Sequence, residues 1–196
     1  MELTAAFVQS NSPALHPVIE AAAEHLEKLT GQRSFSGYQS NDPKYVMAML
    51  QAIHEVLGSD LRLGYINPPP SFEHSGQKVR LVADTLEQKR GTCLDLAILQ
   101  SALWEHIGLH SCIVMVPGHA LLACWMRPSN AKAAVTDLAA SDVEAGGLRN
   151  ALADGSLQLF NSVEITAGRT LADAQTQGRA IVEEVLKTGK RVHIID

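Results

Sequence analysis

Two residues of this sequence have the types and spacing of a thiol catalytic pair. Cys93 opens an expected helix in KRGTCLDLAILQSALWEHIG, and His119 follows the Pro-Gly of VPGHALLACW, 26 positions later (119 − 93). The first turn of a helix lowers a thiol pKa from about 8.5 to roughly 3.5–7.5, because free N–H groups and the helix dipole favour the thiolate. A neighbouring imidazole would then serve as general base, and the Cys93 N–H would donate to an oxyanion. The pair therefore predicts nucleophilic attack on a carbonyl carbon.

An ordinary core is the alternative explanation of the same two residues. Cysteine is among the most buried residue types, and most cysteines in apolar helices are inert. With 8 histidines in the chain, a histidine within thirty residues of a cysteine is unremarkable. Spacing alone leaves both interpretations open.

A metal site is a weaker reading of the cysteines and histidines. The candidate ligands are Cys93, Cys112, Cys124, His106, His110 and His119. The sequence has no Cys-x-x-Cys pair, and His106 and His110 stand on either side of Gly108, where the helix should end. Zinc sites of mixed ligands need tighter paired spacing. We therefore expect no metal and no other cofactor.

The elements around the pair must hold both residues rigidly. The helix that begins near Thr92 is apolar on nearly all sides, which is typical of a helix in the middle of a domain. Thr92 is a plausible cap and Gly108 a plausible stop. The segments SCIVMV (111–116) and HALLACWM (119–126) are short and apolar, and Pro-Gly separates them, so they predict two antiparallel strands.

The rest of the chain predicts an α+β fold in a single domain, 1–196. Hydrophobic periodicity and capping signals give the following elements: a strand over 2–8, helices over 14–31, 41–58 and 81–88, a strand over 132–138, a helix over 141–155 with a Ser141/Glu144 capping box, a strand over 157–166, a helix over 169–189 and a strand over 191–196. Helices come first and strands mostly later, which is the α+β pattern. The proline-rich loop 59–80 is either functional or a packed surface loop.

Composition and charge exclude several classes of protein. The net charge is −5 and no stretch gathers Lys and Arg into a stripe, so a nucleic-acid surface is not expected. No apolar run reaches about 18 residues, so no membrane span is expected. The N-terminus lacks a secretory pattern, and three cysteines without framework spacing suit a reducing compartment. These features predict a cytoplasmic protein.

The segment GTCLDLAILQSALWEHIGLHSCIVMVPGHALLACWM resembles the core of the transglutaminase-like cysteine peptidase superfamily. The run GYINPPPSFEHSGQKVR, followed by GTCLDLA and PGHALLACW, resembles a branch found in large bacterial proteins with helicase and nuclease parts, often suspected in defence against mobile elements. The resemblance covers about residues 34–196, which leaves 1–33 as an N-terminal extension.

That resemblance implies a fold and a set of roles. The fold would be a transglutaminase-like, papain-like core, in which the Cys-bearing central helix packs on an antiparallel sheet and extra helices lie at the N-terminus. Cys93 would be the nucleophile and His119 the general base. The substrate would be a protein or peptide, and a larger multidomain or multi-protein assembly is an expected setting.

The third member of the triad departs from the superfamily's pattern, which is an Asp in a strand ending Asp-x-Thr. Asn161 lies on the expected inward face of strand 157–166 and could orient the imidazole. Glu164 fits the carboxylate-x-Thr spacing but alternates outward. Asp137, 18 residues after His119 (137 − 119), ends AAVTD. We favour Asn161, with Asp137 and Glu164 as alternatives.

Three further side chains bear on the site. Gln77, 16 residues before Cys93 (93 − 77), could complete an oxyanion hole, or it could simply bond loop backbone. Asp95 suits the helix dipole but would oppose a low thiol pKa if it pointed at Cys93. Tyr65 is expected in the core or in a cleft wall.

The sequence therefore predicts a thiol-dependent amide hydrolase or acyl transferase, acting through a thioester on Cys93. Hydrolysis and transfer to a second amine stay open, although no calcium-loop pattern supports a calcium-triggered enzyme. The alternative is a catalytically silent fold that serves as a protein-interaction module, and a regulatory thiol is a third possibility.

Overall fold

The computed structural model describes residues 4–67, 78–128 and 150–195. Its longer helices are α1 (His16–Thr30), α2 (Pro43–Glu55), α3 (Val82–Gln88), α4 (Cys93–His106) and α7 (Leu171–Lys187). Its strands are β1 (Gly64–Tyr65), β2 (Arg90–Gly91), β3 (Ser111–Val116), β4 (His119–Trp125), β5 (Leu157–Phe160) and β6 (His193–Ile195). Shorter helical turns are η1 (Ala5–Phe7), η2 (Pro13–Leu15), η3 (Val56–Asp60) and η4 (Ser162–Ala167). The fold is α+β, as the sequence predicts.

A four-stranded antiparallel sheet forms the centre of the molecule, in the order β5-β4-β3-β6. The expected hairpin of β3 and β4 is confirmed, and Gly118 in its turn has a φ of 77°. Because β5 runs antiparallel to β4, with Trp125 opposite Leu157 and Leu122 opposite Phe160, the end of β5 lies toward the start of β4. This register brings residues just after β5 toward His119.

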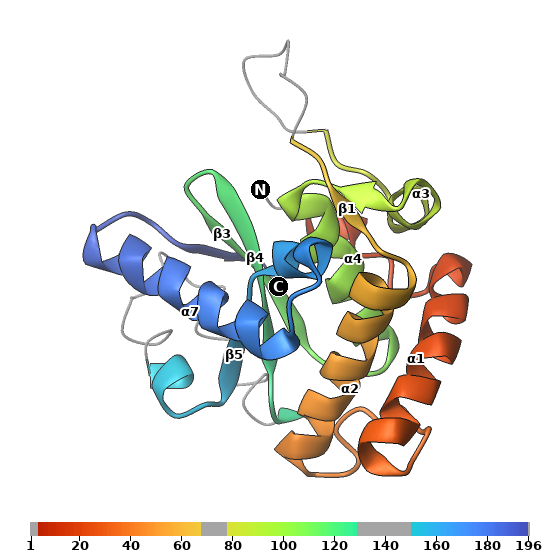
Figure 1. The fold of residues 1–196 in the computed structure, drawn as a ribbon. Coiled ribbons are helices and arrows are strands. Elements are labelled where there is room, and N and C mark those ends of the chain that lie inside the picture. The colour runs from red at the N-terminus through yellow and green to blue at the C-terminus, as the bar shows by residue number, and fades with distance from the viewer. Residues whose placement is uncertain (1–3, 68–77, 129–149, 196) are drawn as a thin grey trace.

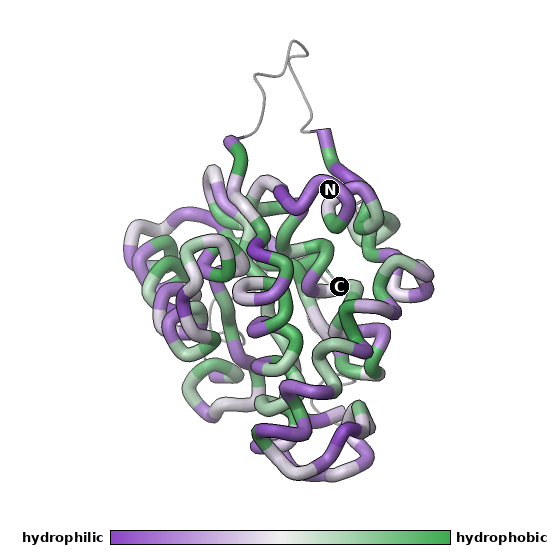
Figure 2. Tube along the Cα trace, turned by 45° about the vertical axis from the view of Figure 1, so that its right-hand side comes forward, coloured by the Kyte–Doolittle hydropathy of each residue, from purple (hydrophilic) through white to green (hydrophobic). Residues whose placement is uncertain are grey.

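The sheet separates two apolar cores. On one face, residues such as Ile113, Leu122 and Phe160 join the helices α1 to α4 in one core. On the other face, residues such as Val114 and Leu121 pack against α7. Figure 1 shows α7 on one side of the sheet and α4, α2 and α1 on the other. In Figure 2 the central segments are mostly green, whereas purple stretches concentrate at the outer turns.

Helix α4 is the most enclosed helix in the described ranges. Every residue from Cys93 to Trp104 is buried, so the helix has no exposed face over its first three turns. Trp104 packs edge-on against Phe160 of β5, with 5.3 Å between ring centroids. The sequence expectation of a central helix is confirmed, and its burial on all sides explains the absence of an amphipathic pattern.

Local signals set the bounds of the first two helices. Helix α1 ends at Gly31, whose φ is 75°, and α2 begins after Asp42, whose carboxylate accepts from the Lys44 N–H at 2.9 Å. The expected end of the second helix at Gly58 is wrong. The α-helix gives way at Val56 to the π-helical turn η3, and a Cβ at Gly58 would lie only 3.2 Å from the Ile165 carbonyl oxygen. Gly58 therefore permits close contact with η4 rather than ending the helix.

Two expected strands differ from the structure. The strand over 2–8 is wrong, because residues 5–7 form the 3₁₀ turn η1, from which Phe7 and Val8 pack on the core. The strand over 157–166 ends at Phe160, because the Asn161 N–H donates to the Ala174 carbonyl of α7 at 2.8 Å and the chain then turns into η4.

Some expectations lie outside the described residues. These are the strand over 132–138, the Ser141/Glu144 capping box and most of the helix over 141–155, together with residues 68–77 of the proline-rich loop. Within the described ranges, none of the helices has the length and apolar character needed to cross a bilayer.

Candidate active site

Cys93 is the first residue of α4 and is 6% exposed. Thr92 caps the helix: its hydroxyl accepts from the Asp95 N–H at 3.3 Å, and its own N–H donates to the Asp95 carboxylate at 2.9 Å. This capping box fixes the first turn, so the thiol lies beside the free backbone N–H groups of a well-ordered helix start.

The residues around the cap explain the Gly-Thr-Cys-Leu-Asp sequence. A Cβ at Gly91 would lie 2.9 Å from the Asp95 Cβ, so only glycine fits before the cap. Asp95 also accepts from the Arg80 backbone and guanidinium, both at 2.8 Å. The carboxylate is thus engaged by Thr92 and Arg80 instead of facing Cys93.

His119 connects the thiol to Asn161. The histidine is the first residue of β4, and its Nε2 lies 2.9 Å from the Asn161 Oδ1. The hydrogen bond with the Cys93 side chain is the main cause that raises the pKa of His119. Burial lowers this pKa, and the bond with Asn161 and the charges of Cys93 and Glu164 raise it again. The protonated form of His119 is therefore more stable at this position than in a free histidine.

The Cys93 thiol responds in the opposite direction. Burial raises its pKa, but the hydrogen bond with His119 and those with the backbone N–H groups of Ala120 and Leu94 outweigh burial. The net effect is a pKa below the ordinary thiol range. The lowered thiol pKa and the raised imidazole pKa together favour a thiolate–imidazolium pair.

Asn161 is held in place from three directions. It is 8% exposed and occupies the position just before η4. Its N–H donates to Ala174 of α7, and its Nδ2 donates to the Glu164 Oε1 at 3.0 Å. The buried Gln100 of α4 donates to the carbonyl of the adjacent Ser162 at 3.2 Å. Helices α4 and α7 and the turn η4 therefore all position this amide.

The structure brings together Cys93, His119 and Asn161, and it places Glu164 behind Asn161 rather than against the imidazole. Gln77 and Asp137, the proposed oxyanion donor and an alternative third member, lie outside the described residues. Sequence reasoning missed the supporting role of Gln100. The signal was a single glutamine inside an apolar helix, since buried polar side chains need partners.

Tyr65 lies at the edge of the site. It is 41% exposed, so a place in the core is wrong. Burial and the charge of Cys93 raise the pKa of Tyr65. The parallel pairing of Tyr65 with Gly91 brings its backbone near the start of α4, because Gly91 precedes Cys93 by two residues.

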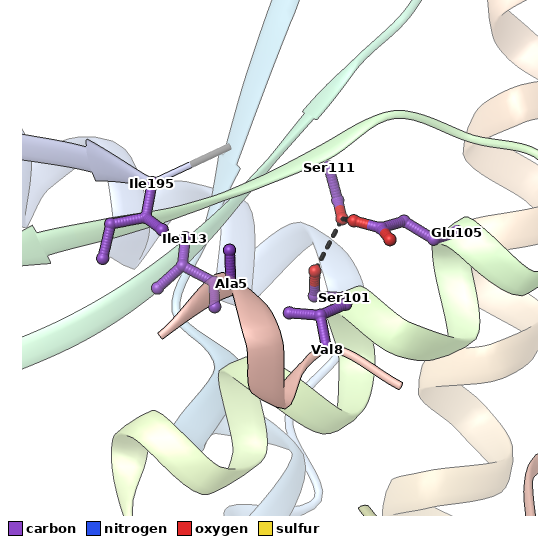
Figure 3. A pocket seen from close by; sticks show the side chains of 7 residues that line it. All are labelled: Ala5, Val8, Ser101, Glu105, Ser111, Ile113 and Ile195. Atoms are coloured by element: carbon purple, nitrogen blue, oxygen red, sulfur yellow. Dashed lines mark hydrogen bonds between the residues drawn. The ribbon is translucent and has the colours of Figure 1, made fainter. Parts of the chain in front are cut away.

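A separate cavity of about 230 Å³ lies along the C-terminal half of α4 (Figure 3). Its lining residues are Ala5, Val8, Ser101, Glu105, Ser111, Ile113 and Ile195. The Ser101 and Ser111 hydroxyls are 2.7 Å apart, and Ser111 donates to Glu105 at 3.2 Å. Ser101 is eight residues from Cys93, about 12 Å along the helix axis. The cavity is therefore distinct from the thiol site.

Gly178 of α7 controls how closely that helix approaches Asn161. A Cβ at this position would lie 2.9 Å from Phe160 backbone atoms and 3.0 Å from the Asn161 nitrogen. Glycine to alanine in a helix interior ordinarily stabilises by about 0.5–1 kcal/mol. We expect Gly178→Ala to do the reverse and lower the free energy of unfolding by about 1–3 kcal/mol, because α7 must move away from β5. Urea unfolding followed by circular dichroism measures the change.

The exposed neighbour Gln177 provides the control for helix propensity. Gln177→Ala changes the same helix without a close contact, so its stability should stay within about 0.5 kcal/mol of wild type. A Gly178→Ala protein as stable as this control, or more stable, would show that the close packing of α7 on Asn161 is not limiting.

The described residues contain no group of three or more His, Cys, Asp or Glu side chains arranged to hold a metal ion. No protein-family model, curated protein or solved structure matches this chain. The resemblance to the transglutaminase-like superfamily therefore stays a prediction.

Proposed function

We propose that this chain is a thiol-dependent amide hydrolase or acyl transferase with a transglutaminase-like core. The observation that carries the proposal is the position of His119, whose ring bonds the Cys93 side chain and, through Nε2, the Asn161 Oδ1 at 2.9 Å. Nucleophile, base and orienting group in this order are the arrangement of thiol hydrolases. A central Cys-bearing helix on an antiparallel sheet is consistent with this core.

The arrangement supports a two-stage reaction. The Cys93 thiolate attacks the carbonyl carbon of an amide, and the Cys93 N–H at the start of α4 is available to the oxyanion. The C–N bond then breaks as the His119 imidazolium gives its proton to the leaving amine, which leaves a thioester on Cys93. Water or a second amine attacks the thioester, His119 takes its proton, and the thiolate is restored. Hydrolysis yields a carboxylic acid and transfer yields a new amide.

A protein or peptide is the substrate that the resemblance favours, and a larger bacterial assembly is its expected setting. The exposed ring of Tyr65, whose strand pairs with Gly91 just before the start of α4, supports an extended substrate, because it offers an aromatic surface near the site.

The reactivity of Cys93 toward iodoacetamide tests the proposal, and the other cysteines serve as internal controls. Cys112 and Cys124 are 1% and 0% exposed, and burial raises the pKa of Cys124 well above its usual range. We expect Cys93 to be labelled at slightly acid pH, where an ordinary thiol of pKa about 8.5 is protonated. Labelling should slow only as the pH falls through the lowered pKa of Cys93. Peptide mass spectrometry across a pH series gives the rate for each cysteine.

A turnover assay then separates enzyme from regulatory thiol. A peptide mixture is incubated with the wild-type protein and with Cys93→Ala, with and without an added primary amine, and the products are identified by mass spectrometry. Cleavage or amine incorporation that Cys93→Ala abolishes supports catalysis. Rapid labelling without turnover would indicate a thiol sensor, and labelling of Cys93 no faster than a free thiol would refute the thiolate–imidazolium pair.

A further inference from the structure

Asn161 has an acidic partner on the side away from His119. Its Oδ1 faces the His119 Nε2 at 2.9 Å, and its Nδ2 donates to the Glu164 Oε1 at 3.0 Å. We infer that Glu164 is a positioning residue, which acts through Asn161 to select the tautomer of His119 and to stabilise its protonated form. The inference rests on the proposed function and extends it from three residues to four.

The direction of the amide follows from what a carboxylate can bond. An ionised carboxylate only accepts hydrogen bonds, whereas an amide has an accepting oxygen and a donating nitrogen. If the Asn161 amide were reversed, its oxygen would face the Glu164 oxygen and two acceptors would oppose each other. Glu164 therefore holds Nδ2 toward itself and Oδ1 toward His119.

The direction of the amide in turn fixes the imidazole. Because Oδ1 can only accept, the His119 Nε2 must carry a proton to bond it. The other ring nitrogen, Nδ1, is then the one left to exchange a proton with Cys93. An asparagine whose amide could turn either way would not select one tautomer of His119. Its NH₂ group could equally donate to an unprotonated Nε2, which would leave the proton on Nδ1.

Glu164 also supplies the negative charge that a triad with an amide as its third member lacks. An amide stabilises an imidazolium less than a carboxylate does. The negative charge of Glu164 is among the causes that raise the pKa of His119. The hydrogen bond from Nδ2 to Glu164 also polarises the Asn161 amide, which strengthens the hydrogen bond between Oδ1 and His119. Among the described residues, Cys93 of α4 acts on His119, Tyr65 of β1 interacts with Cys93, and His54 of α2 is affected by the charges of both Glu164 and Asp173.

The turn η4 makes the contact between Asn161 and Glu164 possible. In a continuing strand, residues three apart point to opposite faces of the sheet. In a 3₁₀ turn, side chains three apart lie on the same side. The break in β5 after Phe160 therefore brings Glu164 back beside Asn161, and the Glu164 N–H donates to the Asn161 carbonyl at 3.1 Å.

Glu164→Gln tests the inference, because glutamine keeps the shape but removes the charge and the acceptor-only character. We expect the pKa of His119, followed by NMR titration, to fall by roughly one unit. The rate of Cys93 alkylation at slightly acid pH should fall about fivefold to tenfold, because a weaker imidazolium supports less thiolate. Glu183→Gln, the same change on the exposed face of α7, is the matched control and should leave both quantities unchanged.

A second pair of variants distinguishes positioning from a merely structural role. Asn161→Asp places a carboxylate against His119 but also against Glu164. The two carboxylates repel each other, so residue 161 no longer holds the imidazole in place and alkylation should be slower than in wild type. Adding Glu164→Gln to Asn161→Asp supplies an amide donor to the new carboxylate. The double variant should then alkylate faster than Asn161→Asp alone, whereas a structural role for Glu164 predicts that the two losses add.

The experiments distinguish a failure of the inference about Glu164 from a failure of the proposed function. A His119 pKa in Glu164→Gln equal to that in Glu183→Gln, or a double variant no faster than Asn161→Asp, would overturn the role of Glu164 while fast labelling of wild-type Cys93 still supports the proposed function. Slow labelling of wild-type Cys93 would overturn the proposed function, and the His119 titration would still decide whether Glu164 acts on the imidazole.

Discussion

Replacement of His119 by glutamine is expected to lower the turnover of any amide substrate by about 10²–10⁴-fold, the usual contribution of a general acid–base group. The same change should also remove the fast alkylation of Cys93 at slightly acid pH. Without the imidazole, the largest cause that lowers the thiol pKa is lost, and only the backbone N–H groups of Ala120 and Leu94 still oppose the rise that burial causes. The variant should therefore recover reactivity only at alkaline pH, when hydroxide removes the thiol proton. Alkylation rates across pH and product mass spectrometry measure the two effects.

Glutamine is the appropriate replacement because its amide can still bond Asn161 and fill most of the space of the ring. His16→Gln is the matched control, since His16 is exposed at the start of α1 and lies far along the chain from the thiol. It should leave the labelling of Cys93 unchanged. If His119→Gln labelled Cys93 as fast as wild type at slightly acid pH, the helix start alone would activate the thiol and the pair would be wrong.

The second large effect is expected on stability, from Asp95→Ala. The Asp95 side chain is fully buried and its carboxylate accepts from the backbone and side chain of both Thr92 and Arg80. Its loss leaves the partly buried Arg80 guanidinium without its carboxylate and removes the acceptor of the Thr92 N–H, which is one half of the capping box. Removing one partner of a buried ion pair costs about 3–5 kcal/mol, a large share of the roughly 5–15 kcal/mol that holds a domain folded. Urea unfolding measures the loss.

The chain contains a matched control for this change. Thr170 and Asp173 form the same capping box at the start of α7, but on the surface and without a buried guanidinium. Asp173→Ala should therefore lower the free energy of unfolding much less than Asp95→Ala. Equal losses in the two variants would mean that the cap alone, and not the buried pair with Arg80, stabilises the helix that carries Cys93.

The sequence was sufficient for the parts of the site that local signals determine. Thr92, the apolar run after it and the Pro-Gly turn before His119 predicted the helix start and the hairpin, because capping and turn chemistry act within a few residues. The choice of Asn161 for the third position came from alternation along an expected strand. The side chain does face His119, but it lies one residue past the end of β5.

The local sequence did not predict where β5 ends or that residues 5–7 form a turn, because contacts between residues distant in sequence determine both. The chain leaves the strand at Asn161 because α7 supplies a backbone acceptor and Gly178 allows that helix to come close. Neither fact is visible in LQLFNSVEIT, where Val163 and Ile165 continue the alternation of a strand. The same holds for residues 5–7, whose apolar side chains would fit a strand equally well. They form a turn because this conformation lets Phe7 and Val8 pack against the core. Tertiary packing overrides local pattern at both positions.

The enclosure of α4 has a consequence for how this site tolerates sequence change. The thiol is carried by a helix whose side chains from Cys93 to Trp104 all contact the interior, so its position is insulated from substitutions at the surface. The orienting amide is carried by a short turn that depends on neighbouring elements for its place. Substitutions in this chain should thus leave Cys93 in place while they alter how the His119 ring is held, and changes in the reactivity of Cys93 should arise on the Asn161 side.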